Sequence, residues 1–459
     1  MDLGRFARCA LGCSLIAGCS VALSPLGHAE GKRDKNIREI DHYVPHVSTV
    51  PANAGKPVKL FVRELVRKRG DDDDDDDDDD DRRGSRKRGD DRDGQQHQSK
   101  AVLLIHGAST PVLAGFQLAH KHHNWSLKLA KAGFDVFMLD LQGSGRSPRT
   151  AMDDPCNAPV AQQTELLIPS PLAQTCAPSF PFVLVNAQSD WDELDTVVDY
   201  IRAYRGLDKV ALAGWSHASV RIGPYAVQHP EKVDRILLLA PIFGDALPAA
   251  RQVGDSFLPP YARTPQGGVR ACTAQELATS TCPADVAPSE LFISGTPMTL
   301  RTRRANLGDP WQAEIACENQ VEEGIDDVVW KAIRENDAIG RTWGPPPDSP
   351  EGLMRVRTFA LWAWNSRTAG KISVPMLLIG GELDTQAPPA SLAQLYSAIA
   401  NELPKLLFKV ACTGHYMPWE RQARVLHQVS KQWLKHGSVE GHSTGKFLVT
   451  TDGDLVPMD

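Results

Sequence analysis

The chain has 459 residues, of which 42% are hydrophobic and 23% are charged. A chain of this length and composition can bury a substantial core as one large domain or two modest ones. The formal net charge of −7 provides no general attraction for nucleic acid, so we expect no nucleic-acid partner.

The amino-terminal residues have the pattern of an export signal. Arg5 and Arg8 precede an apolar run over residues 9–23, and residues 27–29 (Gly-His-Ala) supply small residues at the positions that a signal peptidase reads. The run is too short to span a bilayer permanently. We therefore predict a signal peptide over residues 1–29 and a periplasmic or secreted protein. A lipobox-like sequence at residues 16–19 (Ile-Ala-Gly-Cys) leaves an alternative open, in which Cys19 carries a lipid anchor to the membrane.

Export changes how the cysteines are interpreted. Three of the nine lie in the leader, and an even number remains: Cys156, Cys176, Cys272, Cys282, Cys317 and Cys412. An even number in an oxidising compartment favours disulfides over metal ligation, and six cysteines allow fifteen pairings. Because short loops close at low entropic cost, we favour Cys156–Cys176 and Cys272–Cys282, which leaves Cys317 to pair with Cys412.

The first part of the mature chain is polar, and we expect residues 30–56 to form an extended lead-in. Val58, Leu60 and Val62 recur at every second position, with Leu65 breaking the register, and predict a strand over residues 57–66. An unbroken aspartate run follows at residues 71–81. Adjacent carboxylates repel one another and bury nothing, so we predict a disordered loop over residues 67–99. Binding of calcium or of a cationic surface is the alternative, but disordered carboxylates form no fixed coordination shell for calcium.

A compact apolar strand over residues 100–105 runs into His106, Gly107 and Ala108, where a glycine lets backbone N–H groups approach a ligand. We predict a helix over residues 116–132. It would carry His120, His122 and His123, which do not share one helical face, and no carboxylate lies at matching spacing, so we expect no metal site.

A further strand over residues 134–139 leads to a glycine-rich turn, residues 140–147, which lacks the third glycine and the helix start of a dinucleotide site. We therefore expect no cofactor. Residues 148–186 are rich in proline and predict a long loop, closed by Cys156 and Cys176. An amphipathic helix beginning at Ser189 then leads to the next strand.

Residues 210–219 predict a short apolar strand, a sharp turn that presents Ser216, and the start of a helix. A serine hydroxyl is a poor nucleophile unless a base removes its proton, so a catalytic serine needs exposure, a histidine and oxyanion donors. The sequence Gly-Trp-Ser-His-Ala at 214–218 is close to the G-x-S-x-G elbow, with Ala218 in place of the second glycine. Taken alone, the pentapeptide is also compatible with an ordinary surface turn.

After a strand over residues 235–242, residues 244–370 break the alternation of strands and helices and are rich in tryptophan. We predict a mostly helical cap over the site, because an aromatic insertion at the carboxyl ends of parallel strands forms an apolar pocket. An independent domain core is the alternative. Strands are predicted over residues 374–379 and 406–410, followed by a helix to residue 435 and a terminal hairpin over residues 447–456.

Asp384 follows the first of these late strands, and His415 follows the second. The order serine, aspartate, histidine resembles that of the α/β-hydrolases, and the resemblance extends over residues 57–435. It implies a mostly parallel central sheet flanked by helices. The core would comprise residues 57–243 and 371–436, separated by the cap insertion 244–370 and followed by a C-terminal tail, 437–459.

The resemblance also implies roles for the site residues. Ser216 would be the nucleophile, His415 the general base and then acid, and Asp384 the carboxylate that orients the imidazole. The backbone N–H groups of Ala108 and His217 would form the oxyanion hole, with the His217 side chain lining the pocket. Asp245 is the alternative acid.

A serine nucleophile argues against the dehalogenase and epoxide-hydrolase branches, which use aspartate there. Hydrolysis of a carboxylic ester of a small-molecule acyl substrate is therefore the expected activity. Carbon–carbon bond hydrolysis, cofactor-free peroxidation and a catalytically silent exported binding protein stay open as alternatives.

Overall fold

The structure is a computed structural model that describes residues 34–50, 53–68, 100–108, 110–149, 154–165, 172–179, 187–244, 298–343, 353–357 and 364–459, with short pieces between 261 and 285. The predicted signal peptide, the aspartate run, Asp245 and Cys272 lie outside the described residues. No helix in the described ranges is long and apolar enough to cross a membrane.

Within the described residues, ten strands form one sheet in the order β1-β2-β4-β3-β5-β6-β11-β12-β13-β14. Their bounds are β1 Ile37–Val47, β2 Pro57–Arg67, β3 Lys100–Ile105, β4 Phe134–Asp140, β5 Val210–Trp215, β6 Val233–Leu239, β11 Met376–Gly381, β12 Lys405–Val410, β13 Gly445–Val449 and β14 Leu455–Pro457. The strands from β4 to β13 run parallel in this order, whereas β1, β2 and β14 pair antiparallel at the edges.

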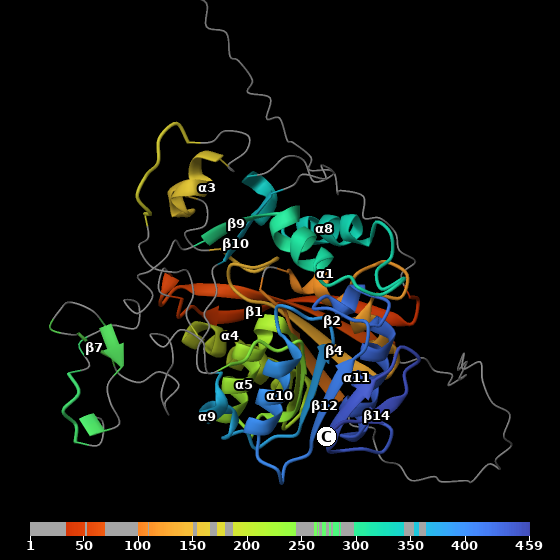
Figure 1. Cartoon of the computed structure of the whole chain (residues 1–459). Helices are drawn as coiled ribbons and strands as arrows, with labels where there is room; N and C mark the ends of the chain where they lie inside the picture. The colour runs from red at the N-terminus through yellow and green to blue at the C-terminus, as the bar shows by residue number, and fades with distance from the viewer. Residues whose placement is uncertain are drawn as a thin grey trace, which may run out of the picture. The chain divides into compact units, whose positions relative to one another are not determined.

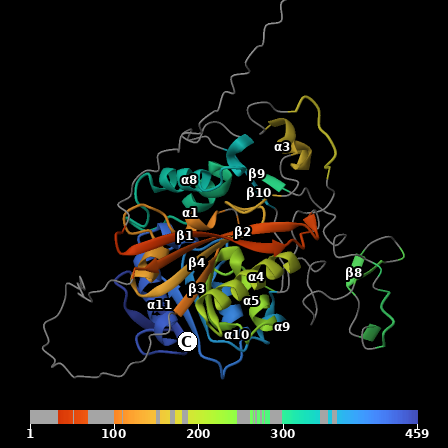
Figure 2. The same ribbon diagram turned by 180° about the vertical axis from the view of Figure 1, so that it is seen from behind.

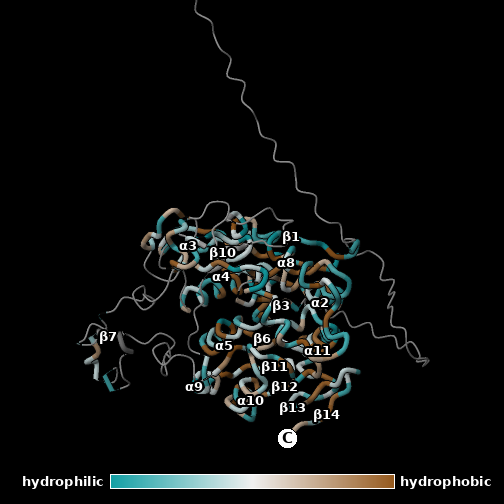
Figure 3. Tube along the Cα trace, turned by 45° about the horizontal axis from the view of Figure 1, so that its top comes forward, coloured by the Kyte–Doolittle hydropathy of each residue, from teal (hydrophilic) through white to brown (hydrophobic). Residues whose placement is uncertain are grey.

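Helices flank the sheet because the central strands are apolar on both faces. Val102 and Leu104 of β3 belong to one hydrophobic cluster, which α2 (Trp125–Lys131) and α11 (Ala423–His436) join. Leu103 of the same strand belongs to a second cluster with α4 (Ala187–Arg205), α5 (Ser219–Gln228), α9 (Ser366–Ala369) and α10 (Pro389–Ala398). Figures 1 and 2 show α4, α5, α9, α10 and α11 from opposite sides, and Figure 3 shows the chain coloured by hydropathy.

The predicted core strands are confirmed, and one strand of the central sheet was not predicted. Residues 37–47, part of the expected lead-in, form β1 and pair antiparallel with β2 over their whole length. Tyr43 and Val47 of this edge strand are exposed, so its sequence carries little of the alternation that marks a half-buried strand. The predicted terminal hairpin is confirmed as β13 and β14.

The predicted helix over residues 116–132 is wrong. Helix α1 (Val112–Phe116) ends where it was expected to begin, and α2 begins at Trp125 after a loop. Asn124 caps α2, since its side chain accepts a hydrogen bond from the N–H of Leu127 at 2.9 Å. His120, His122 and His123 therefore lie in a loop, and the helical-face argument against a metal site does not apply to them.

The predicted disulfides are confirmed where the structure describes both cysteines. Cys156–Cys176 closes the proline-rich loop, which also contains a short 3₁₀ helix, η2 (Pro155–Asn157), and α3 (Val160–Glu165). Cys317–Cys412 joins the insertion to the loop that precedes His415. Cys282 is disulfide-bonded, and its predicted partner lies outside the described residues.

The insertion is not mostly helical in the part that the structure describes. It contains two small antiparallel sheets, from β7 (Tyr261–Arg263) with β8 (Val269–Ala271) and from β9 (Met298–Thr302) with β10 (Leu353–Arg357). Its helices are η6 (Arg304–Gly308), α7 (Asp309–Gln312), α8 (Ile325–Glu335) and η7 (Gly340–Trp343). Trp311 and Trp330 are buried in the same cluster as α2 and α11, so this part of the insertion shares the core of the sheet.

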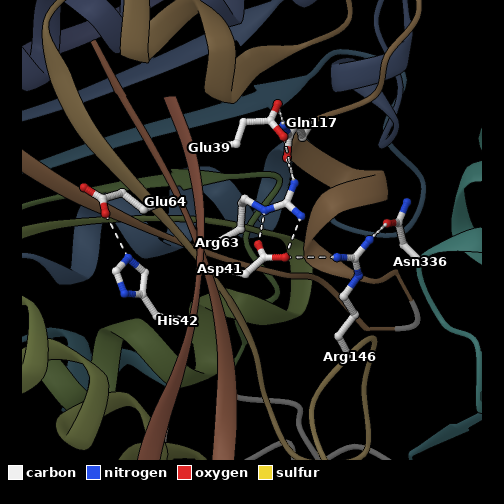
Figure 4. A network of polar contacts seen from close by, with 8 residues as sticks. All are labelled: Glu39, Asp41, His42, Arg63, Glu64, Gln117, Arg146 and Asn336. Carbon is white, nitrogen blue, oxygen red and sulfur yellow. Dashed lines mark hydrogen bonds and ion pairs between the residues drawn. The ribbon is translucent and has the colours of Figure 1, made fainter. Parts of the chain in front are cut away.

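Polar contacts also fasten the insertion to the core. Arg146, in the turn after β4, donates to the side-chain amide oxygen (Oδ1) of Asn336 at the end of α8 (3.2 Å) and forms an ion pair with Asp41 of β1 at 3.5 Å. Figure 4 shows this network, in which Asp41 also pairs with Arg63 of β2. Arg149 and Asp337 form a fully buried ion pair beside it. The end of α8 is thus tied to the edge of the sheet.

Candidate active site

Ser216 lies at the sharp turn between β5 and α5. Its backbone φ is +57°, a left-handed conformation that a non-glycine residue adopts only where the surroundings impose it. A Cβ on Gly214 would lie 2.5 Å from the Ala218 Cβ and 2.5 Å from the Ile222 Cδ1. The alanine that departs from the elbow motif therefore packs into space that Gly214 leaves empty, and only the first glycine of the pentapeptide is sterically required.

Three side chains from separate loops form a continuous hydrogen-bonded chain. The Nε2 of His415 lies 2.8 Å from the Ser216 Oγ, and its Nδ1 lies 2.9 and 3.0 Å from the two Asp384 carboxylate oxygens. All three are buried, with Ser216 the most exposed at 9%. An ionised carboxylate only accepts hydrogen bonds, so Nδ1 carries the proton and Nε2 offers its lone pair to the serine hydroxyl.

The loop after β11 holds the Asp384 carboxylate in place. Its Oδ1 accepts hydrogen bonds from the N–H groups of Gln386 at 2.9 Å and Ala387 at 2.7 Å. These backbone donors fix the carboxylate on its own loop and leave it facing the imidazole. The structure thus brings together Ser216, Asp384 and His415, the three residues predicted from their chain order.

The strand end predicted to supply an oxyanion donor lies beside the serine. A Cβ on Gly107 would lie 3.5 Å from the Ser216 Cβ, and Ala108 lines the same cavity as Ser216. His217 is buried but is not among the described residues that line this cavity, so the expectation for its side chain is not met. The backbone N–H groups of Ala108 and His217 stay the predicted donors.

A buried arginine connects the elbow helix to this strand end. The Arg221 Nε donates to the Asp190 carboxylate at 2.9 Å, and its Nη1 donates to the carbonyl oxygen of His106 at 2.7 Å. Both charged side chains are 1% exposed. A buried ion pair with further hydrogen bonds fixes geometry more than it adds stability, and this pair fixes the serine turn relative to Ala108.

The tryptophan of the elbow contacts the histidine loop. The Trp215 Nε1 donates to the His415 carbonyl oxygen at 2.9 Å. Its ring packs edge-on against Trp419, with centroids 4.8 Å apart. Trp215, at the variable second position of the elbow motif, therefore holds the loop that carries His415 in place.

Two buried carboxylates from outside the triad hold the base loop by its backbone. The Glu420 Oε2 accepts from the N–H of Gly414 at 2.9 Å, and the Glu314 Oε2 accepts from the N–H of His415 at 2.6 Å. The other Glu314 oxygen accepts from the N–H and the hydroxyl of Thr385, at 2.9 and 2.7 Å. Glu314, which belongs to the insertion, therefore joins the loop that carries Asp384 to the loop that carries His415.

The close packing of Glu314 and Glu420 around the base loop explains why residue 414 is a glycine, and burial explains why the pKa of Glu420 is raised. A Cβ on Gly414 would lie 2.5 Å from the Glu314 Oε2, so this position requires glycine. Burial, with a smaller contribution from nearby Glu314, raises the pKa of Glu420 to about 7. The unfolded chain would lose that proton near the ordinary pKa of 4.5. The contribution of Glu420 to the free energy of unfolding therefore falls as pH rises from 4.5 to about 7.

A cavity of about 180 Å³ opens at the serine. Residues of the insertion form one side of it, among them Arg301, Asn306 and Leu307. Tyr416 also lines the cavity, and its hydroxyl donates to the Asn306 carbonyl oxygen at 3.1 Å. Burial raises the pKa of Tyr416 to about 12. The cavity is therefore lined jointly by the insertion and by the loops that carry the predicted triad.

Sequence reasoning missed Glu314, Glu420, Arg221 and Arg301. Arg221 gave a usable signal, because it lies on the apolar face of an otherwise buried helix. Glu420 also lies directly after the apolar residues 416–419. Glu314 and Arg301 are distant in sequence from every predicted motif, and only the folded insertion brings them to the site.

The chain was compared with known families, curated proteins and solved structures. Residues 100–273 match the family model described as the alpha/beta hydrolase fold. No curated protein matches the chain. Similar solved structures include a bromoperoxidase from Bacillus anthracis, with 14% identity and a TM-score of 0.43, covering 87% of this chain and 100% of that chain. A monoacylglycerol lipase from Paleococcus ferrophilus has 15% identity and a TM-score of 0.39, covering 73% and 93%.

Proposed function

We propose that this chain, an α/β-hydrolase by its fold, is a serine hydrolase that cleaves a carboxylic ester or a related acyl bond. The observation that carries the proposal is the 2.8 Å hydrogen bond between the His415 Nε2 and the Ser216 Oγ, with the Asp384 carboxylate on the opposite ring nitrogen. A serine becomes nucleophilic when such a base takes its proton.

The proposed reaction has two halves. The Ser216 oxygen attacks the acyl carbon while its proton passes to the His415 Nε2, and the N–H groups of Ala108 and His217 bind the oxyanion. His415 then protonates the departing alkoxide, which leaves an acyl-enzyme on Ser216. In the second half His415 takes a proton from water, the hydroxide attacks the acyl group, and the serine is regenerated.

The cavity indicates which acyl substrates to test. Of the described residues that line it, Arg301 is the one with a permanent positive charge, and the Nε of Arg301 is buried without a hydrogen-bond partner. Buried guanidinium groups favour carboxylate partners. A substrate panel should therefore pair each neutral ester with one that carries a carboxylate.

We expect purified protein to react with a fluorophosphonate at Ser216 and to hydrolyse at least one member of a panel of esters, thioesters, amides and lactones. Mass spectrometry of the labelled peptide and a pH-stat assay are the measurements. Absence of labelling would favour a silent binding protein. Labelling without acyl hydrolysis would reject the ester and leave carbon–carbon hydrolysis or peroxidation, which a dicarbonyl substrate and a halide–peroxide assay distinguish.

We also propose that the protein is exported. The apolar leader and the disulfides Cys156–Cys176 and Cys317–Cys412 support this, because disulfides persist in oxidising compartments. The mature protein should then have the mass of a chain that begins at Glu30. An acylated chain beginning at Cys19 would instead identify a lipoprotein, and a full-length intracellular chain would reject export.

A further inference from the structure

A group of potential metal ligands lies in the loop between α1 and α2. His122 and His123 belong to this loop, and Glu322 belongs to the insertion just before α8. One ligand atom from each residue can be chosen so that all three lie within 4.8 Å of one another. None of the three lines the cavity at Ser216.

The hydrogen bonding of His123 leaves its Nε2 without a hydrogen-bond donor to accept from. Its Nδ1 lies 3.1 Å from the carbonyl oxygen of Pro418, and because a carbonyl only accepts, Nδ1 carries the proton. The Nε2 then presents a lone pair. It is fully buried without a hydrogen-bond partner, and it lies 3.5 Å from a Glu322 carboxylate oxygen. Two acceptors would repel at this distance, so the contact calls for a positive charge at this place: either a second proton on the ring, which forms an ion pair with Glu322, or a metal ion between the two atoms.

We propose that His122, His123 and Glu322 form a binding site for a divalent transition metal, with Zn²⁺ as the best match. Two imidazole nitrogens and a carboxylate oxygen are a common ligand set for zinc. Ligands about 2.0–2.1 Å from a tetrahedral zinc ion lie roughly 3.4 Å apart, and the observed separation of 3.5 Å between His123 and Glu322 is close to that. The Pro418 carbonyl would hold the tautomer of His123 in the way that outer partners of zinc ligands do.

Lys121 provides the counter-charge when no metal is bound. Its Nζ lies 2.5 Å from the Glu322 Oε2, and the Lys121 side chain is 60% exposed. A long exposed ammonium side chain can move into solvent, so a metal ion would compete with Lys121 for the carboxylate.

A metal ion at this site would stabilise the folded protein and would take no part in the proposed acyl hydrolysis. A metal held there would join the loop after α1, the segment before α8 and, through Pro418, the loop that follows His415. Since ions that bind only the folded state stabilise it, zinc should raise the midpoint of thermal unfolding. It should leave the identity of the reacting serine unchanged.

The test uses the mature, disulfide-bonded protein after removal of metals with a chelator. Zinc is titrated against a chromogenic chelator, and thermal unfolding is followed with and without zinc. We expect one high-affinity zinc ion per chain and a higher unfolding midpoint. Glu322→Gln and His122→Ala, both at incompletely buried positions, should weaken binding at least about tenfold. Lys121→Met should strengthen it severalfold, because it removes the competing cation.

His229 provides a matched control, because it lies 3.6 Å from the Glu231 carboxylate at a partly exposed position and belongs to no such group among the residues that the structure describes. His229→Ala should bind zinc as the parent protein does. The proposal is overturned if Glu322→Gln and His122→Ala bind zinc as tightly as His229→Ala, or if zinc leaves the unfolding midpoint of the parent protein unchanged. Should His123→Ala fail to fold, these two variants still decide the question.

Discussion

Replacing Ser216 with alanine is expected to reduce ester hydrolysis by roughly three to six orders of magnitude and to abolish fluorophosphonate labelling. The hydroxyl is the group that His415 contacts at 2.8 Å, and no other atom of this side chain can attack an acyl carbon. The measurement is kcat/KM for the best ester of the panel, with circular dichroism to show that the fold is retained. Ser397→Ala, on the exposed side of α10, is the matched control.

The same mechanism predicts how the other members of the triad respond. His415→Ala should lose about as much activity as Ser216→Ala, and the double variant should lose little more, because the two residues act as a unit. Asp384→Asn should cost less than either, since it alters the tautomer of the ring but leaves serine and histidine in place. Undiminished hydrolysis of every ester by Ser216→Ala would place the chemistry elsewhere in the protein.

The core strands could be predicted because each is a short apolar run that the parallel sheet buries on both faces. The β4 strand is buried at all its residues, and its sequence needs no tertiary information to be recognised. The positions of Asp384 and His415 could be predicted for a related reason. Both directly follow such strands, and the carboxyl ends of neighbouring parallel strands meet at one edge of the sheet.

The edge strand β1 and the loop of residues 117–124 could not be predicted from local sequence. Strand β1 forms because β2 offers a full ladder of hydrogen-bond partners, which no pattern within residues 37–47 records. In the loop, Leu118 and the cap residue Asn124 are compatible with either a continuous helix or two helices. In the structure the Asn124 side chain accepts a hydrogen bond from the N–H of Leu127, so that a new helix begins after Asn124. A residue in an N-cap conformation cannot continue a preceding helix.

The Cys317–Cys412 disulfide could be predicted from the sequence, whereas the role of the Glu314 carboxylate could not. The pairing Cys317–Cys412 followed from counting cysteines once the two short loops were assigned. Glu314 lies only three residues before Cys317, yet nothing local distinguishes it from the exposed acidic residues nearby. Its importance depends on Thr385 and His415, which are 71 and 101 residues away in the chain.

Glu314→Gln is expected to lower kcat by about ten- to a hundredfold with a smaller change in KM. The carboxylate accepts hydrogen bonds with both oxygens, one from the N–H of His415 and the other from Thr385. An amide of the same shape has a single oxygen, so in either orientation its NH₂ group faces a backbone N–H. One buried donor is left unpaired at a cost of about 1–3 kcal/mol, and the loops that carry Asp384 and His415 lose their shared anchor.

The effect on kcat distinguishes a positioning role from a purely structural one. A small displacement of the imidazole misaligns proton transfer without blocking the cavity, so kcat should fall while substrate binding is largely retained. The kinetics are measured well below the unfolding temperature, with active sites counted by fluorophosphonate titration. Glu318→Gln, at an exposed position four residues away, should behave like the parent protein. A Glu314→Gln variant that is less stable but has an unchanged kcat per titrated site would show that Glu314 supports the fold alone.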